Sequence, residues 1–259
     1  MENIAVISDI HGNIPALDTV LADIRSRGIK RIVCLGDVVG KGPQPEQAVD
    51  ICREVCEVVV MGNHDDIMSD GRRHSILPSL DWHRDRLGRE RLDYLAGLPP
   101  VYNLLVSGHR IRLYHASHVG VHHRVRMTDP EETHRAMFTN TPFTGDGLLP
   151  DVVGYGDIHQ AYYETFRGGG VLFNTGSVGN PLDEPLASYA ILEGNINDET
   201  PGPLNIQLIR MPYDIDAAVR IAFEEGLPEA ELGPWEDELR TGRYRRDPAS
   251  RAWRETVKE

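Results

Sequence analysis

Three short polar segments in the first quarter of the chain carry side chains that can bind metal ions. The segments Asp9-Ile10-His11, Gly36-Asp37 and Gly62-Asn63-His64-Asp65 appear in that order, and each follows a short apolar run. Carboxylate, amide and imidazole groups without a thiolate suit Mn, Fe, Zn or Mg in a hydrolytic site. A carboxylate between two such ions can also bridge them. The segments therefore predict the first half of a two-metal hydrolytic site.

The apolar runs before these segments have the composition of buried parallel strands. Residues 4–7, 32–35 and 58–61 are short and rich in β-branched side chains. Apolar residues at helical spacing in 15–24 and 44–54 separate the runs, so strand and helix alternate. Open α/β sheets bind ligands beyond the carboxyl ends of their parallel strands. A βαβ unit that presents the three segments at one edge of its sheet is therefore expected.

Two later segments complete a candidate set of ligands. His115 ends one apolar stretch, and Gly156-Asp157-Ile158-His159 ends another. The five segments in this order resemble the calcineurin-like metallophosphoesterase superfamily, whose pattern is D-x-H, G-D, G-N-H-[DE], H and G-H-x-H. The resemblance covers residues 4–192 and includes the stretch 174–181 after the last ligand pair. Within the superfamily, the chain is most similar to small bacterial proteins labelled phosphodiesterase or diadenosine tetraphosphatase-like.

The resemblance implies two divalent ions, and the oxygen and imidazole donors without cysteine make Mn²⁺ the first expectation, with Fe, Zn, Ni or Mg as alternatives. It distributes the ligands over two sets that share one carboxylate, namely Asp9, His11, Asp37 and His159, and Asp37, Asn63, His115 and Asp157. A hydroxide that bridges the ions would then attack phosphorus. His64 resembles the catalytic histidine of the superfamily, which protonates the leaving group or holds a phosphate oxygen. Asp65, which is not itself a ligand, is expected to fix the tautomer of His64.

One position departs from the superfamily pattern. Asp157 stands where the pattern has the first histidine of G-H-x-H. A carboxylate can ligate the same metals, but a third carboxylate leaves the two ions with one surplus positive charge instead of two. The carboxylate is also shorter than imidazole, so Asp157 would have to approach the ion closely or reach it through water. The substitution therefore predicts a weaker attraction for a phosphate dianion.

A polar segment after His115 supplies candidates for substrate binding, at a place where related chains carry Gly-Ser-Pro or similar residues. The candidates are His118, His122, Arg124 and Arg126. Arginine and histidine over a metal site could bind a second phosphate or a carboxylate. An exposed polar loop is the alternative interpretation. Arg72 and Arg73, shortly after the third metal-binding segment, are weaker candidates for substrate contact.

After residue 102 the chain changes to shorter runs of β-like composition. They occupy residues 102–106, 110–114, 151–154, 162–167, 171–173, 188–193 and 204–211. The runs predict a second, largely antiparallel sheet packed on the first. The resemblance makes this a four-layer α/β/β/α sandwich of two mixed sheets flanked by helices. A catalytic domain over 1–212 is expected, followed by a helical extension over 213–259 that packs on it, with a helix at 214–225 and a mobile tail after Gly242.

Length, composition and charge fit one catalytic domain. A chain of 259 residues with 40% hydrophobic composition can enclose a single large core. Its formal net charge of -13 argues against broad nucleic-acid binding, although bound metals would set the local potential for a small phosphate ester. The sequence shows no leader and no apolar run of membrane-spanning length, and its three cysteines fit a reducing compartment. A cytoplasmic protein is therefore expected, with its oligomeric state left open.

The leading functional hypothesis is metal-dependent hydrolysis of a phosphodiester or phosphomonoester, in a nucleotide or another small phosphorylated metabolite. A protein phosphatase is a weaker alternative. That branch of the superfamily has G-D-x-x-D-R-G, whereas this chain has Gly40 and Lys41 at the second Asp and the Arg. Lysine is a point charge and lacks the planar fork of arginine. A third alternative is a binding scaffold that keeps the fold without activity, which Asp157 alone favours.

Overall fold

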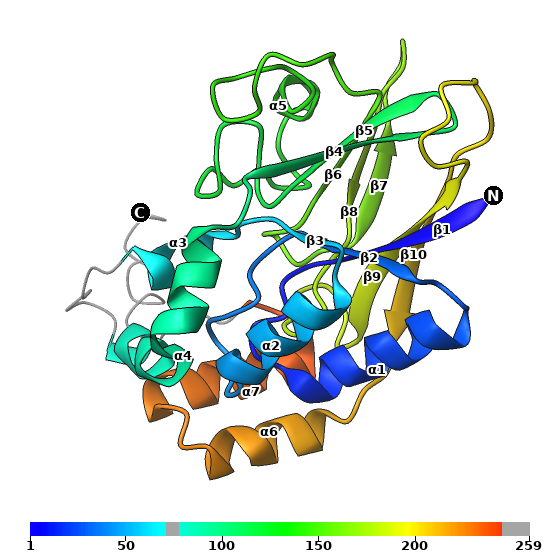
Figure 1. Cartoon of the computed structure of the whole chain (residues 1–259). Helices are drawn as coiled ribbons and strands as arrows, with labels where there is room; N and C mark the ends of the chain where they lie inside the picture. Colours follow the sequence, from blue (N-terminus) through cyan, green and yellow to red (C-terminus); the bar gives the residue numbers. More distant parts are fainter. Residues whose placement is uncertain (71–77, 245–259) are drawn as a thin grey trace, which may run out of the picture.

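Two five-stranded sheets packed face to face form the centre of the molecule (Figure 1). The computed structural model describes residues 1–70 and 78–244. The first sheet has the strand order β10-β9-β1-β2-β3. Its strands are β1 (Glu2–Ile7), β2 (Arg31–Cys34), β3 (Val58–Val59), β9 (Ala187–Gly194) and β10 (Asn205–Met211). The first three are parallel and are connected by α1 (Ile14–Ser26) and α2 (Pro45–Val55), which confirms the predicted βαβ opening.

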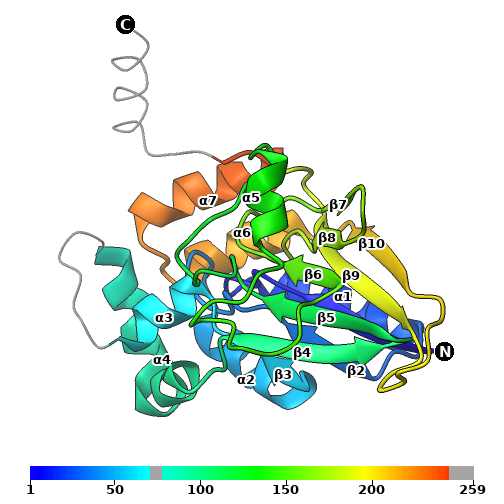
Figure 2. The same cartoon turned by 90° about the horizontal axis from the view of Figure 1, so that it is seen from above.

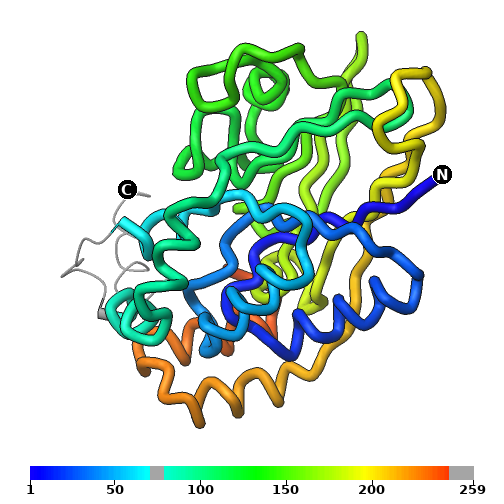
Figure 3. Tube along the Cα trace, in the orientation of Figure 1, coloured from blue at the N-terminus to red at the C-terminus, as the bar shows by residue number. Residues whose placement is uncertain are grey.

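The second sheet has the strand order β4-β5-β6-β8-β7. Its strands are β4 (Val101–Val106), β5 (His109–Tyr114), β6 (Val152–Tyr155), β7 (Tyr162–Thr165) and β8 (Val171–Asn174). The prediction of a largely antiparallel second sheet is wrong, because β5, β6 and β8 are parallel and only the two edge strands run the other way. The last two predicted strands also belong to the first sheet, where β9 pairs with β1 (Figure 3).

Helices and loops cover the outer faces of both sheets, which confirms the predicted four-layer sandwich. The helices α1 and α2 pack on the first sheet together with α4 (Pro78–Ala96), which also contacts α3 (Asn63–Ser69). Figure 2 views the molecule from the side of the second sheet, where α5 (Glu131–Ala136) and long loops form the outer layer. Side chains such as Val6, Leu113 and Phe173 are fully buried between the sheets. This shared core fixes the two sets of strand ends relative to each other.

Two further helices, α6 (Ile215–Glu224) and α7 (Glu229–Thr241), follow β10 and pack outside the helices that cover the first sheet, where α6 contacts α1 and α7 contacts α6. The helix α6 lies where the sequence predicts one. Trp235 of α7 is buried in a cluster with Ala218 and Ala222 of α6 and Trp82 of α4. The predicted mobile tail falls largely on 245–259, which lies outside the described residues, as do Arg72 and Arg73. No helix in the described part of the chain is long and apolar enough to cross a membrane.

Candidate metal centre

The loops after five strands bring the predicted ligands together at one edge of the sandwich, where the two sheets meet. Asp9 and His11 follow β1, Asp37 follows β2, Asn63 begins α3 after β3, His115 follows β5, and Asp157 and His159 follow β6. Asn63 is half-buried and the other six are buried. The strand ends of both sheets therefore contribute to one site, as the sequence predicts for the first three segments.

The backbone at this edge is strained where it carries the ligands. The described part of the chain has eight non-glycine residues with positive φ, and five of them, with φ between 49° and 63°, are Asp9, His11, Asp37, Asp157 and His159. A left-handed conformation costs an L-residue about 1–2 kcal/mol and persists only where the surroundings enforce it. Hydrogen bonds between the loops do so here, because the amide of Asp9 donates to Gly36 and that of His11 donates to Asp37. Strain concentrated in this way marks a functional site.

Glycine is required where two of these loops pass each other. A Cβ atom at Gly62 would overlap the amide and the Oδ1 atom of Asp37. One at Gly156 would overlap Ser8 Oγ and would lie 2.6 Å from Asp9 Oδ2. The two glycines thus let the backbone approach the carboxylates directly, which fits the expectation drawn from their positions beside the ligands.

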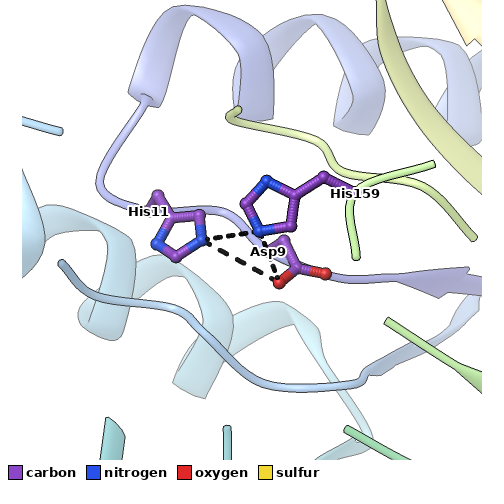
Figure 4. Close-up of side chains that lie close together, drawn as sticks. All are labelled: Asp9, His11 and His159. Carbon is purple, nitrogen blue, oxygen red and sulfur yellow. Dashed lines mark hydrogen bonds and ion pairs between the residues drawn. The ribbon is translucent and has the colours of Figure 1, made fainter. Parts of the chain in front are cut away.

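His11 and His159 present two nitrogen lone pairs to the same point (Figure 4). Their Nε2 atoms are 3.2 Å apart, while the Nδ1 atoms face the carbonyl oxygens of Val39 at 3.1 Å and Asn180 at 2.5 Å. A carbonyl oxygen only accepts, so in the neutral form of each ring Nδ1 carries the proton and Nε2 has a free lone pair. Asp9 Oδ1 lies 3.2 Å from His159 Nε2 and has no hydrogen-bond partner in the described chain. Three converging acceptors of this kind fit a cation.

Asp37 lies between this group and a second one. Its Oδ2 atom is 3.6 Å from His11 Nε2, and its Oδ1 atom is 3.4 Å from His115 Nε2. His115 Nε2 is also 3.0 Å from Asn63 Oδ1, and its Nδ1 donates to the carbonyl of Leu35 at 2.8 Å. The carboxylate of Asp37 therefore offers one oxygen to each group, as a bridging ligand must. Close sets of possible donors are Asp9, His11 and His159; His11, Asp37 and His64; and Asp9, Asp37 and His115.

The ionisation of these groups reflects a buried cluster rich in carboxylates. Burial raises the pKa of Asp37 well above its usual range, and the neighbouring carboxylates of Asp9 and Asp65 add to this effect. Burial would lower the pKa of His115, but the carboxylates around it outweigh that effect and raise its pKa to about 9. Burial would also raise the pKa of Asp9, but His159, His115 and Ser8 together outweigh it and hold that pKa at about 2. Divalent cations would relieve this concentration of negative charge.

His64 lies beside the cluster without the partner that the sequence predicts for it. Its Nδ1 has no hydrogen-bond partner in the described chain, and its amide donates to Asp37 Oδ1 at 2.8 Å. The carboxylate of Asp65 instead accepts the amides of Asp37 at 2.8 Å, Val38 at 3.0 Å and Gly62 at 3.0 Å. The expected role of Asp65 toward the His64 ring is therefore wrong. Asp65 is the third residue of α3, so its side chain points back toward the helix start and fixes the Asp37 loop.

Asp157 reaches the cluster but has a different main partner. Its Oδ1 atom is 3.8 Å from His115 Nε2, and its amide donates to Asp9 Oδ2 at 3.1 Å. Both oxygens of its carboxylate accept from Arg124, at 2.8 Å from Nε and 2.7 Å from Nη2. Asp157 also belongs to none of the three close donor sets. Its role as a ligand therefore stays a prediction.

A pocket of about 460 Å³ opens over the cluster, and two of the four candidate substrate-binding residues line it. Arg124 and Arg126 line it, together with Asp37, Lys41, His64, Asp157 and His159. His118 and His122 are absent from its lining, and His122 is exposed and bound to Asp66 at 2.7 Å. Sequence reasoning missed Arg243 and Tyr244, which reach the pocket from the end of α7. Their only signal was the basic composition after Gly242.

Comparisons with known proteins agree with this geometry. The calcineurin-like phosphoesterase superfamily domain matches residues 2–196. The chain belongs to this superfamily. The membership predicted from five short motifs is thereby confirmed, and the donor sets described above are groups that could hold a metal ion in a chain of this metal-dependent superfamily.

Similar proteins come from archaea and bacteria. The uncharacterized protein MJ0912 of Methanocaldococcus jannaschii is 31% identical over 238 residues, which cover 87% of this chain and 94% of the relative. The phosphodiesterase YfcE of Escherichia coli K12 is 27% identical over 206 residues, which cover 76% of this chain and 90% of that protein. A metallophosphoesterase structure from Sphaerobacter thermophilus, 25% identical, matches 92% of this chain and 99% of its own with a TM-score of 0.70. The fold of PH1004 from Pyrococcus horikoshii matches with a TM-score of 0.73 at 21% identity, covering 93% and 99% of the two chains.

Proposed function

We propose that this protein hydrolyses phosphate esters of small molecules, such as nucleotides or other phosphorylated metabolites, with two divalent metal ions. The superfamily and the similarity to the phosphodiesterase YfcE support phosphoester hydrolysis in general. The observation that carries the metal requirement is the pair of Nε2 lone pairs of His11 and His159, which face each other at 3.2 Å. Mn²⁺ is the first candidate for both ions, because the donors are oxygen and imidazole nitrogen.

The donors divide into two sets around Asp37. Asp9, His11 and His159 with one oxygen of Asp37 would hold the first ion, and Asn63 and His115 with the other oxygen would hold the second. Divalent ions bound there would lower the pKa of a coordinated water and offset the charge of the phosphate. The backbone carbonyls of Val39, Leu35 and Asn180 keep the three imidazoles in the tautomer that ligation requires.

His64 is the residue that we assign to the leaving group. Its ring lies at the pocket wall, with its centroid 5.0 Å from that of His11. Burial lowers its pKa well below the usual value, and nearby Lys41 and His159 act in the same direction. Without a bound phosphate the His64 ring is therefore neutral, and a dianionic phosphate beside it would favour its protonated form. In that form it can hold a phosphate oxygen or give its proton to the departing alkoxide.

The two alternative functions are supported less well. For a protein phosphatase, the position of the phosphate-binding arginine is occupied by Lys41, whose Nζ is held by Glu238 at 3.2 Å. An inactive scaffold would need a damaged ligand set, and the pairing of Asp157 with Arg124 is the one observation in that direction. The other predicted ligands converge, which favours an active centre.

A chromogenic substrate tests the proposal. Purified protein loaded with Mn²⁺ should hydrolyse bis(p-nitrophenyl) phosphate or p-nitrophenyl phosphate, and exhaustive chelation should stop the reaction. Asp37→Ala should be inactive on both esters, whereas Asp18→Ala, a matched change of an exposed aspartate on α1 that does not line the pocket, should behave as wild type. Undiminished turnover after chelation, or in Asp37→Ala, would contradict the proposal.

A further inference from the structure

Arg124 and Asp157 form a fixed pair at the floor of the pocket. Nε and Nη2 of the guanidinium donate to the two carboxylate oxygens at 2.8 and 2.7 Å, the side-on bidentate geometry that holds an arginine in one orientation. The side chain of Asp157 is 3% exposed, whereas that of Arg124 is 46% exposed. The carboxylate is thus a buried anchor, and the guanidinium extends from it toward the opening.

The pair is electrically equivalent to the residue that the superfamily pattern places at position 157. A neutral histidine contributes no charge to the cluster, and the negative charge of Asp157 is cancelled by the positive charge of Arg124. The weaker attraction for phosphate that the sequence predicts from Asp157 alone therefore does not follow once Arg124 is counted. Unlike a histidine, the pair adds N–H donors to the pocket. Nη1 of Arg124 has no hydrogen-bond partner in the described part of the chain and remains available.

We propose that Arg124 binds an anionic oxygen of the substrate phosphate and that Asp157 is the residue that positions it. This inference rests on the proposed function and deepens it. A fixed guanidinium beside the metal donors favours a phosphoryl group with two negative charges, as in a phosphomonoester, over the single charge of a diester. Asp157 then acts through Arg124, and the second ion depends on Asp37, Asn63 and His115.

The surrounding charges support an anion site. Although the chain carries a formal net charge of -13, Arg126, Lys41 and Arg243 line the same pocket as Arg124. Lys41 makes one contact with a carboxylate of the described chain, at 3.2 Å to Glu238, whereas two short hydrogen bonds to Asp157 hold Arg124, so the orientation of Arg124 is the better fixed of the two. Arg110 offers a matched control, because it pairs with Asp151 at 3.1 Å in an exposed position outside this pocket.

Binding of two probes tests the role of Arg124 without turnover. Titration calorimetry of Mn²⁺-loaded protein at pH 8 would compare inorganic phosphate, mainly a dianion, with dimethyl phosphate, a monoanion. Arg124→Gln should weaken phosphate binding about 10- to 100-fold, as expected for a lost charge-assisted hydrogen bond, and dimethyl phosphate binding by less. Arg124→Lys should recover only part of the loss, and Arg110→Gln should match wild type. Unchanged phosphate binding in Arg124→Gln would overturn the proposal.

Metal content tests the role of Asp157. Asp157→Asn should keep the Mn²⁺ stoichiometry of wild type and still weaken phosphate binding, because Arg124 loses its anchor. The double variant Arg124→Gln/Asp157→Asn should bind phosphate no more weakly than Arg124→Gln, since both changes break one interaction. Loss of an ion in Asp157→Asn would show a ligand and overturn the positioning role. Thermal denaturation of each variant confirms that it is folded.

These outcomes are separate from the fate of the proposed function. If wild type binds phosphate through Arg124 but hydrolyses neither chromogenic ester, the anion site stands and the hydrolytic function fails. If wild type hydrolyses the esters while Arg124→Gln keeps the same KM and phosphate affinity, the function stands and the anion site fails.

Discussion

Removal of divalent metal should leave a proton on His115, which makes metal binding depend on pH. The side chain is fully buried, and its Nε2 atom lies 3.4 Å from Asp37 Oδ1 and 3.8 Å from Asp157 Oδ1. Burial acts to lower its pKa, but these carboxylates and Asp9 raise it from 6.5 to about 9. An ion can bind Nε2 only after the proton has left, so the two events are linked.

The size of the pH dependence of metal binding follows from the pKa shift of His115. A change of the His115 pKa from 6.5 to about 9 corresponds to about 3 kcal/mol, or a roughly 300-fold change in an equilibrium constant. Between pH 6.5 and 9, the Mn²⁺ affinity should rise by about a factor of ten per pH unit through this group alone. The folded-state pKa is raised, so protonated His115 stabilises the chelated protein fully below pH 6.5. That contribution is lost as the pH rises through 9.

Titration calorimetry with Mn²⁺ at a series of pH values measures this linkage in chelated wild type and His115→Asn. The variant should bind Mn²⁺ more weakly, with a slope of log affinity against pH that is smaller by about one proton. His109→Asn, a change outside the donor sets, should keep the wild-type slope. Equal slopes in wild type and His115→Asn would refute the reasoning, because the proton displaced by metal would then come from another group.

Three further predictions concern single residues of the centre. Asp37→Ala should lose more bound metal and more activity than alanine at any other candidate ligand, because each of its two carboxylate oxygens faces a different group; metal counting checks this. His64→Ala should keep its metal and lose about 10²- to 10⁴-fold in turnover, with the larger loss for an alkyl than for an aryl leaving group. Gly62→Ala should lower the free energy of unfolding by at least about 1–3 kcal/mol, since its Cβ would overlap Asp37; chemical denaturation measures the change.

The first strands and the position of the candidate ligands at their ends were predictable from the sequence because their signals are local. The runs of β-branched residues before Asp9, Asp37 and Asn63 mark the parallel strands, and the motif residues stand directly at their ends. Strand partners were not predictable in the same way. The composition of residues 187–211 predicts two strands but does not say which sheet they join. The pairing of β9 with β1, and of β10 with β9, places both in the first sheet.

Contacts between side chains far apart in the sequence could not be predicted either. The motif that contains Asp65 predicts that this residue supports the ligands without binding metal. Helix geometry, however, directs the Asp65 carboxylate to backbone amides and away from His64. The sequence singles out Asp157 as a departure from the superfamily pattern and Arg124 as a cation in a loop. Their bidentate pairing depends on how the loop after β5 folds over β6, which no local pattern encodes.

The donors around Asp37 should catalyse phosphoester hydrolysis only when they hold metal. The most direct test adds Mn²⁺ stepwise to chelated protein and measures bound metal and p-nitrophenyl phosphate turnover in the same samples. We expect no turnover at zero occupancy and a rise that is completed as the second ion binds. Full turnover at zero occupancy, or two tightly bound ions without turnover on any phosphate ester, would contradict it.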